Sequence, residues 1–180
     1  RHLQTIARAK DRMDRLIQDL LDVTRVEAGK ALVFEPRRER PRTLLPEACV
    51  SFDMSAREKQ VQLTCHVAEQ ISDVLVDRGR IIQVLSNLIG NALKFTPEGG
   101  RIEVSAVQDQ GFVLVSVHDT GPGIPGEDLD RIFHAFWQAP RAARLGAGLG
   151  LAISRGIVQQ HGGHIVVDSF DEIHRLRGRG

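Results

Sequence analysis

The chain is poor in the features that mark special classes of protein. It has two cysteines in 180 residues, and Cys49 and Cys65 lie outside any Cys-x-x-Cys pattern, which favours a reduced pair of thiols over a disulfide framework. Neither sign of charge dominates: 24 Lys and Arg stand against 23 Asp and Glu, so no global field calls for nucleic acid or an anionic membrane. No apolar run approaches the roughly 20 residues of a membrane span, and the N-terminus lacks the apolar core of a signal peptide.

What remains is the composition of an ordinary folded domain. Apolar residues make up 42% and charged residues 26% of the chain, which is too hydrophobic for a disordered protein. The length fits one medium domain with a short appendage. Because the sequence begins at Arg1 without a methionine, we expect a piece of a longer protein. We expect this piece to be cytoplasmic, and a membrane anchor elsewhere in the parent protein is left open.

The first segment has the pattern of one long amphipathic helix. Its apolar residues form a single stripe, consisting of Ile6, Met13, Leu16, Ile17, Leu20, Val23 and Val26. The recurrence of apolar residues at Ile6, Met13 and Leu20 is typical of a helical bundle or a coiled coil. Such a helix needs a partner, and two copies of the stripe in residues 6–26 could form a weak homodimer.

A linker is predicted after this helix. Gly29 stands where a helix C-cap would lie, and the three prolines between Pro36 and Pro46 disfavour further helix. We therefore divide the chain into a helix at 1–30, a linker at 31–43 and a main domain at 44–180.

The main domain alternates between helix and strand patterns. The predicted elements are a helix at about 44–59, a strand at 61–67, a helix from Arg78 to Phe95, two strands joined by a short connection at 108–111, a helix at 149–161 and a strand at 165–167. The inward-facing residues of the two middle strands are Ile102, Val104, Ala106, Val113, Val115 and Val117. This order predicts an α+β fold, a two-layer α/β sandwich with a mixed sheet and helices on one face.

Two amide side chains and one cationic side chain share one side of the helix that is predicted to end at Phe95. Steps of four and three place Asn87, Asn91 and Lys94 on the same face. Carboxamide oxygens are hard ligands suited to Mg²⁺, and an ammonium group one turn on can balance phosphate charge. Taken alone, an exposed polar stripe explains the pattern about as well.

A glycine-rich turn follows the second middle strand. It reads Asp119-Thr-Gly121-Pro-Gly123-Ile124-Pro125, with glycines where a backbone turns sharply or approaches a ligand closely. A buried Asp119 could accept a hydrogen bond from the exocyclic amine of adenine, which guanine does not offer at that place. An ordinary turn after a strand is the alternative interpretation.

Two further motifs come next. Phe133, Phe136 and Trp137 gather in one short segment, where they either anchor a mobile loop or, as is more usual for such a segment by itself, form local core. The chain then runs through Arg144 into the glycines of the run Gly146-Ala-Gly148-Leu149-Gly150, which lead into a helix. The unpaired N–H groups and the positive dipole end of a helix N-terminus suit a polyphosphate.

In this order the four motifs resemble the N, G1, F and G2 boxes of the histidine kinase catalytic domain, in the Bergerat (GHKL) ATPase superfamily. The resemblance covers about 77–163, and residues 12–29 look like the second dimerisation helix of that family. It implies that ATP and Mg²⁺ bind, with Asn91 as the metal ligand and Asn87 beside it. It further implies phosphate binding by Lys94 and the region of Gly148 and Gly150, adenine recognition by Asp119, and a nucleotide site completed by Phe95, Gly121, Gly123, Ile124, Phe136, Arg144, Gly146 and Leu149.

One position favours phosphoryl transfer over hydrolysis. The related ATPases place a glutamate one helical turn before the Mg²⁺ asparagine, where this chain has Asn87. A carboxamide cannot act as a general base, so transfer to a separate nucleophile is the better interpretation. We predict Asn87, Asn91 and Lys94 as the catalytic residues of a protein histidine kinase.

The acceptor of the phosphoryl group is missing from the sequence. In the family it is a histidine on the first helix of the dimerisation hairpin, and no such motif occurs here, since His2 reads as a surface residue. We therefore interpret residues 1–30 as the second helix of a truncated hairpin. The expected partners are the histidine-containing hairpin of the parent kinase and a response regulator, and this piece alone should bind ATP without phosphorylating itself.

The end of the chain departs from the family pattern. After Phe170 the sequence alternates poorly, where the family closes its sheet with one more strand. An alternative function also stays open at this point, a nucleotide-sensing interaction module of the same fold that binds ATP without transferring phosphate.

Overall fold

The computed structural model describes residues 10, 13, 17–25, 28–30, 32–139 and 147–168. The chain divides into two compact units. We call residues 34–129 with 166–180 the sheet unit, and residues 1–33 with 130–165 the helical unit.

A three-stranded mixed sheet forms the base of the sheet unit. Its strands are β2 (Gln62–Val67), β4 (Arg101–Asp109) and β5 (Phe112–Asp119), in the order β2-β4-β5. The pair β2 and β4 is parallel, whereas β4 and β5 form an antiparallel hairpin. Ile102, Val104 and Ala106, at alternate positions along β4, are at most 1% exposed, which follows from the two-residue side-chain period of a strand.

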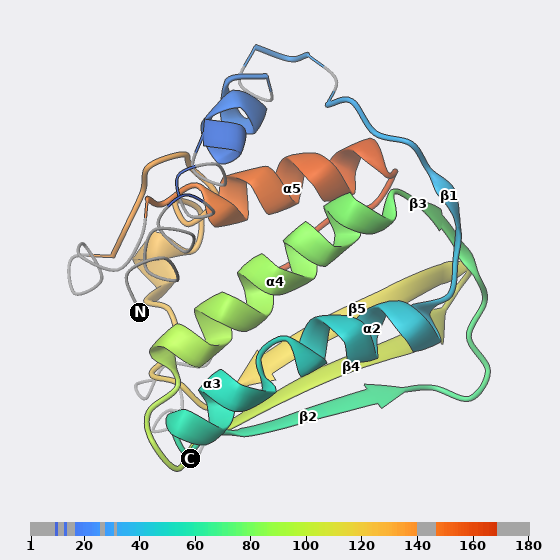
Figure 1. The fold of residues 1–180 in the computed structure, drawn as a ribbon. Helices are drawn as coiled ribbons and strands as arrows, with labels where there is room; N and C mark the ends of the chain where they lie inside the picture. Colours follow the sequence, from blue (N-terminus) through green and yellow to red (C-terminus); the bar gives the residue numbers. More distant parts are fainter. Residues whose placement is uncertain are drawn as a thin grey trace, which may run out of the picture. The chain divides into compact units, whose positions relative to one another are not determined.

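Three helices cover one face of this sheet (Figure 1): α2 (Pro41–Val50), α3 (Asp53–Glu58) and α4 (Arg78–Phe95). Their apolar side meets the inward residues of β4. The buried cluster consists of Leu45, Ala48, Cys49, Val61, Leu85, Ile89, Ala92, Ile102, Val104 and Ala106. The predicted two-layer α+β sandwich with helices on one face is therefore confirmed.

A second, two-stranded sheet lies at the start of the sheet unit. Strand β1 (Arg37–Glu39) pairs antiparallel with β3 (Val74–Val76). The sequence patterns did not predict either strand, because three residues are too few for an alternation to be recognised. Through this pairing, part of the segment predicted to be a linker becomes strand.

The predicted helix at 44–59 is instead two helices with an earlier start. Helix α2 begins at Pro41, a residue that the first turn of a helix tolerates because its missing N–H would have no partner there. Helix α2 ends at Val50, and a turn in which Phe52 N donates to Cys49 O (2.9 Å) separates it from α3.

The predicted strand at Ile165–Val167 is wrong. No strand is present among the described residues 163–168, and the side chain of Val166 is 77% exposed. Alternating apolar residues favour an extended chain, but a strand also requires a neighbour to complete its hydrogen bonds. Residues 169–180, including the tail after Phe170, lie outside the described residues.

In the helical unit, residues 17–25 are helical and α5 spans Gly150–Gln160, as predicted for both segments. Gly29 has a positive φ of 64°, and Lys30 N donates to Arg25 O (2.8 Å), so Gly29 ends the first helix as expected. Of the predicted stripe, Val23 is buried, whereas Met13, Ile17 and Leu20 are exposed. Ile6, Leu16 and Val26 lie outside the described residues. In the part of the chain that the structure describes, no helix is both long and apolar enough to span a membrane.

Candidate functional site

Helix α4 presents the predicted ligand residues of the sheet unit. Its observed bounds, Arg78–Phe95, are those expected from the sequence. Asn87, Asn91 and Lys94 follow one another at helical spacing along one face, and all three are half-buried. The two amides and the ammonium group therefore stand in a row that remains accessible to a ligand.

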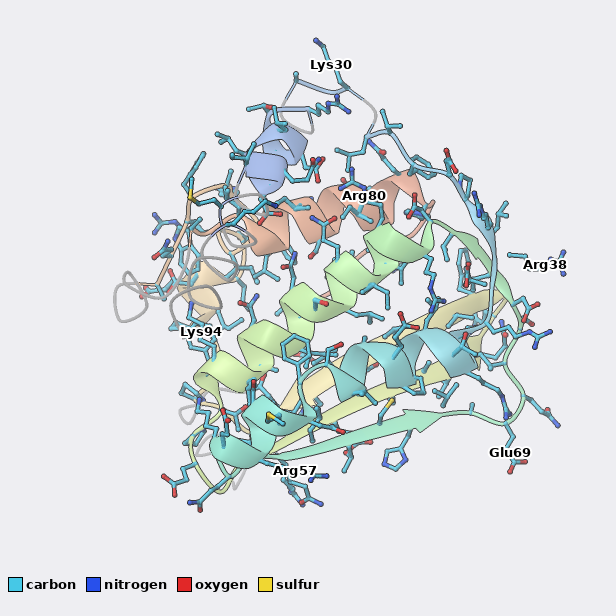
Figure 2. All side chains as sticks on the ribbon, viewed as in Figure 1. Lys30, Arg38, Arg57, Glu69, Arg80 and Lys94 are labelled. Atoms are coloured by element: carbon cyan, nitrogen blue, oxygen red, sulfur yellow. The ribbon has the colours of Figure 1, made fainter. Side chains whose placement is uncertain are left out.

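The C-terminal end of α4 carries a cation in a partly desolvated setting. Lys94 Nζ lies 4.6 Å from the centre of the Phe95 ring, and Figure 2 shows Lys94 toward one end of α4 and Arg80 toward the other. Burial lowers the pKa of Lys94 below its ordinary 10.5, because a desolvated ammonium group is less stable than a hydrated one. An anionic ligand at this position would restore the favourable environment of the charge.

Sequence reasoning missed a residue at this same helix end. Lys59 Nζ donates hydrogen bonds to Leu93 O (2.7 Å) and Lys94 O (2.9 Å). Lys59 directly follows α3 and is far from α4 in the sequence. No local pattern relates such a lysine to a distant helix end, so no signal in a single sequence would have found it.

The turn after β5 brings three predicted residues together. Gly121 N donates to Asp119 Oδ1 (2.8 Å), which orients the half-buried carboxylate and engages one of its oxygens. A methyl group on Gly121 would come within 2.6 Å of Asp119 Oδ1 and 3.3 Å of Phe95 O. A side chain at position 121 would therefore displace the Asp119 carboxylate and press on the end of α4, which favours glycine at this position.

Two further residues of the predicted site, Gly123 and Ile124, belong to the same turn. Gly123 has a positive φ of 78°, as expected where a glycine permits a sharp turn. Ile124 is half-buried. Asp119 lies opposite the buried Ile102 in the strand register, so its side chain belongs to the face of the sheet that the helices cover.

The helical unit joins the aromatic segment to the glycine loop. Phe136 N donates to Gly148 O (2.9 Å), and a methyl group on Gly148 would lie 2.7 Å from Trp137 O. Phe136 itself has a positive φ of 65° and is 59% exposed. The interpretation of this residue as local core is therefore wrong, and a strained backbone of this kind persists only where the surrounding structure holds it.

The glycines before α5 are described only in part. Leu149 is buried, and Gly150 is the first residue of the helix. Arg144 and Gly146, predicted to contact the nucleotide, lie outside the described residues. On α5 itself, the guanidinium group of Arg155 lies 5.4 Å from the centre of the Phe133 ring, which ties this helix to the aromatic segment.

The donor set of the sheet unit fits the chemistry of Mg²⁺ and a nucleotide. Among the described residues, no group of three or more His, Cys, Asp or Glu side chains could hold a metal. The half-buried Asn91 offers an amide oxygen, a hard ligand of the kind that Mg²⁺ accepts. The space beside Gly121 is taken up by Asp119 Oδ1 and Phe95 O, so the glycine lets the proposed base-recognition turn pack against the end of α4. These observations are compatible with the residues predicted to bind ATP and Mg²⁺.

The two cysteines lie between helix and sheet, away from these residues. Both thiols are free. Burial, together with a hydrogen bond to Cys65, raises the pKa of Cys49 to about 12. Cys49 is therefore protonated at neutral pH and is unsuited to nucleophilic chemistry.

Comparison with known proteins gives consistent matches. The Histidine kinase-, DNA gyrase B-, and HSP90-like ATPase family matches residues 76–180. The signal transduction histidine-protein kinase BarA of Escherichia coli is 36% identical over 172 residues, which are 91% of this chain and 19% of BarA. This chain therefore spans about a fifth of that relative.

Two solved structures extend the likeness. Full-length ShkA in complex with AMPPNP has a TM-score of 0.75 and 31% identity over 93% of this chain and 36% of that one. The histidine kinase ThkA in complex with the response regulator protein TrrA has a TM-score of 0.66 and 30% identity over 86% of this chain and 43% of that one.

Proposed function

This chain belongs to the Histidine kinase-, DNA gyrase B-, and HSP90-like ATPase family as the catalytic ATP-binding domain of a bacterial sensor histidine kinase, and on that premise we propose that it binds Mg²⁺-ATP and transfers the γ-phosphate to a histidine outside this sequence. The observation that carries the proposal is Asn87, half-buried on the same face of α4 as Asn91. An amide at this position cannot take a proton from water. Transfer to a histidine, itself a competent nucleophile, needs no such base.

The sheet unit supplies the base and metal contacts in this proposal. Asp119, held by Gly121 N, accepts from the amino group of adenine, and Asn91 is the Mg²⁺ ligand with Asn87 beside it. Lys94 balances phosphate charge. Bound Mg²⁺ would supply neutralisation of the phosphate oxygens. Phe95, Gly123 and Ile124 complete the walls of this part of the site.

The sequence motifs also lead us to propose phosphate contacts at the glycines before α5. In this proposal the N–H groups at Gly148, Leu149 and Gly150 bind phosphate oxygens where α5 begins, which the positive end of a helix favours. Phe136, whose N–H group is bonded to Gly148 O, anchors the glycine segment that precedes α5. The roles of Arg144 and Gly146 stay predictions from the sequence.

The partners follow from the same premise. We propose that residues 1–30 are the second helix of the dimerisation hairpin, that 31–43 link it to the catalytic domain at 44–180, and that the parent kinase phosphorylates a response regulator. The complex of ThkA with TrrA supports a response-regulator partner for this family. ATP as the substrate favours a cytoplasmic location for this domain.

Supply of the missing acceptor tests the proposal. The chain is mixed with a separate protein that carries the acceptor-histidine hairpin and with ATP labelled in the γ-phosphate. We expect label on the histidine of the added hairpin, none on the chain alone, and none when the added histidine is replaced by alanine. Persistent absence of label, in the presence of measured Mg²⁺-ATP binding, would instead support a nucleotide-sensing module.

A further inference from the structure

We propose that Lys59 is a positioning residue for the nucleotide site, because its ammonium group caps the C-terminus of α4 and holds the turn that carries Lys94 and Phe95. Lys59 Nζ donates to Leu93 O at 2.7 Å and to Lys94 O at 2.9 Å. The proposal deepens the proposed ATP-binding function and rests on it.

The hydrogen bonds at this helix end show why the cap matters. The last four carbonyl groups of a helix have no partner within the helix. Ala92 O accepts from Thr96 N (2.9 Å) and from Thr96 Oγ1 (2.7 Å), so this carbonyl group is satisfied by the first residue after the helix. Leu93 O and Lys94 O are satisfied from outside by Lys59. A positive charge at the C-terminus also interacts favourably with the helix dipole.

Lys59 is itself held in place by backbone contacts. Lys59 N donates to Ser55 O (3.1 Å), and the neighbouring Gln60 O accepts from Gly99 N (3.0 Å) in the turn after α4. The half-buried side chain therefore spans between two segments that are already joined by their backbones. A donor fixed in this way loses less conformational entropy on bonding than a free surface lysine would.

The capped turn leads directly to the proposed base-recognition turn. Phe95 O lies so close to Gly121 that a Cβ there would stand 3.3 Å from it, and Gly121 N orients the carboxylate of Asp119 at 2.8 Å. The two hydrogen bonds of Lys59 Nζ go to the backbone of α4, at Leu93 O and Lys94 O. Its effect passes through the backbone of α4, so movement of the last turn displaces Lys94 at once and the Asp119 turn indirectly.

Two substitutions and a matched control test the role. Lys59→Met keeps the length of the side chain but removes the donors, whereas Lys59→Arg keeps donors and charge. Arg57→Met is the control, because Arg57 is an exposed residue of α3, the short helix that Lys59 follows. For each variant we would measure the dissociation constants of Mg²⁺-ATP and of adenosine by calorimetry, and amide hydrogen exchange at the end of α4.

We expect Lys59→Met to weaken Mg²⁺-ATP binding about tenfold, the effect of about one lost charge-assisted hydrogen bond, and to weaken adenosine binding less, because Lys94 serves the phosphates. Exchange at residues 93–96 should rise. Lys59→Arg should restore both properties, and Arg57→Met should change neither. These comparisons are made well below the melting temperature of every variant.

Two results would overturn the proposal in different ways. If folded Lys59→Met binds Mg²⁺-ATP within twofold of the parent while its melting temperature falls, Lys59 only stabilises the fold and the ATP-binding function stands. If the parent chain binds no nucleotide although exchange at residues 93–96 depends on Lys59, the proposed function fails, and Lys59 is a helix cap without a ligand to serve.

Discussion

The two ends of α4 are fastened by opposite kinds of residue. At the beginning, Asp77 Oδ1 accepts from Arg80 N (3.0 Å) and Asp77 Oδ2 from Glu35 N (2.9 Å). At the other end, the cationic Lys59 donates to two carbonyl groups. Arg80 and Lys94 mark these two ends in Figure 2. Each cap has the sign of charge that the helix dipole prefers at that end.

The caps differ in what they hold. The beginning of α4 is tied to the segment before β1 through the bond of Asp77 with Glu35 N. The ion pairs of Arg78 tie it further to Glu39 of β1 (3.2 Å) and to Glu47 of α2. The other end carries the residues that face the proposed ligand. We therefore expect substitutions at the N-terminal end of α4 to lower the stability of the fold and to leave nucleotide binding unchanged. Substitutions toward the C-terminal end should weaken nucleotide binding.

The largest effect is expected from Asn91→Ala. Loss of the proposed Mg²⁺ ligand should weaken ATP binding in the presence of Mg²⁺ by on the order of 100-fold, with little effect on folding, since alanine favours helix. Calorimetry with and without Mg²⁺ would measure this effect, and urea unfolding would verify the fold. Unchanged Mg²⁺-dependent affinity would contradict the metal assignment.

Asp77→Ala should show the reverse behaviour at the other end of α4. Removal of an N-cap acceptor costs about 1–2 kcal/mol of unfolding free energy, whereas Mg²⁺-ATP affinity should stay within twofold. Asp77→Asn is the control that keeps an acceptor oxygen. A large loss of affinity in folded Asp77→Ala would abolish the distinction between the two ends.

Lowering the pH should remove the contribution of the Asp77 cap to the unfolding free energy. Burial alone would raise the pKa of Asp77, but the backbone N–H groups of Glu35, Arg80 and Gly79 outweigh it and lower the pKa below 3.8. The stabilisation is therefore complete above pH 3.8 and is lost as the pH falls through the lower pKa of the folded state. Urea titrations should give a parent and an Asp77→Asn variant whose stabilities converge in acid.

At the C-terminal end of α4, high pH should weaken the binding of Mg²⁺-ATP. Because burial lowers the pKa of Lys94 below 10.5, and the protonated form attracts phosphate, Mg²⁺-ATP affinity should fall as the pH rises through that lowered pKa. A guanidinium group stays charged in this range, so Lys94→Arg should give a flat profile whatever its absolute affinity. A parent profile as flat as that of Lys94→Arg would contradict the phosphate role.

The smallest effect is expected from Arg78→Met. The side chain of Arg78 is 43% exposed in its ion pairs with Glu39 and Glu47, and such pairs contribute about 0–1 kcal/mol. The difference in unfolding free energy between parent and variant should shrink further in 1 M salt, where the Debye length falls to about 3 Å. A difference that persists in salt would indicate a packing role for Arg78.

The elements predicted correctly are those whose sequence signals lie within the element itself. The bounds of α4 follow from its periodicity and from the turn signal after Phe95. The glycine-rich turn from Asp119 onward was recognised in the same way, because its residues are adjacent in the sequence. The prediction of a strand at Ile165–Val167 was wrong because an alternating pattern favours an extended chain but does not show whether a neighbouring strand is available to pair with it. Lys59 and the pairing of β1 with β3 escaped prediction since each depends on residues far apart in the sequence.

The parallel pairing of β2 with β4 has a consequence for the order of folding. The hairpin of β4 and β5 closes through Gln110 and Gly111, both with positive φ, so it can form as soon as it is synthesised. Strand β2 must wait until β3 and α4 have been made, and a pairing of such high contact order is slow. Pulse-labelled amides should therefore become protected in β4 and β5 before β2, and a nascent chain that ends before Arg101 has no central strand on which β2 could dock.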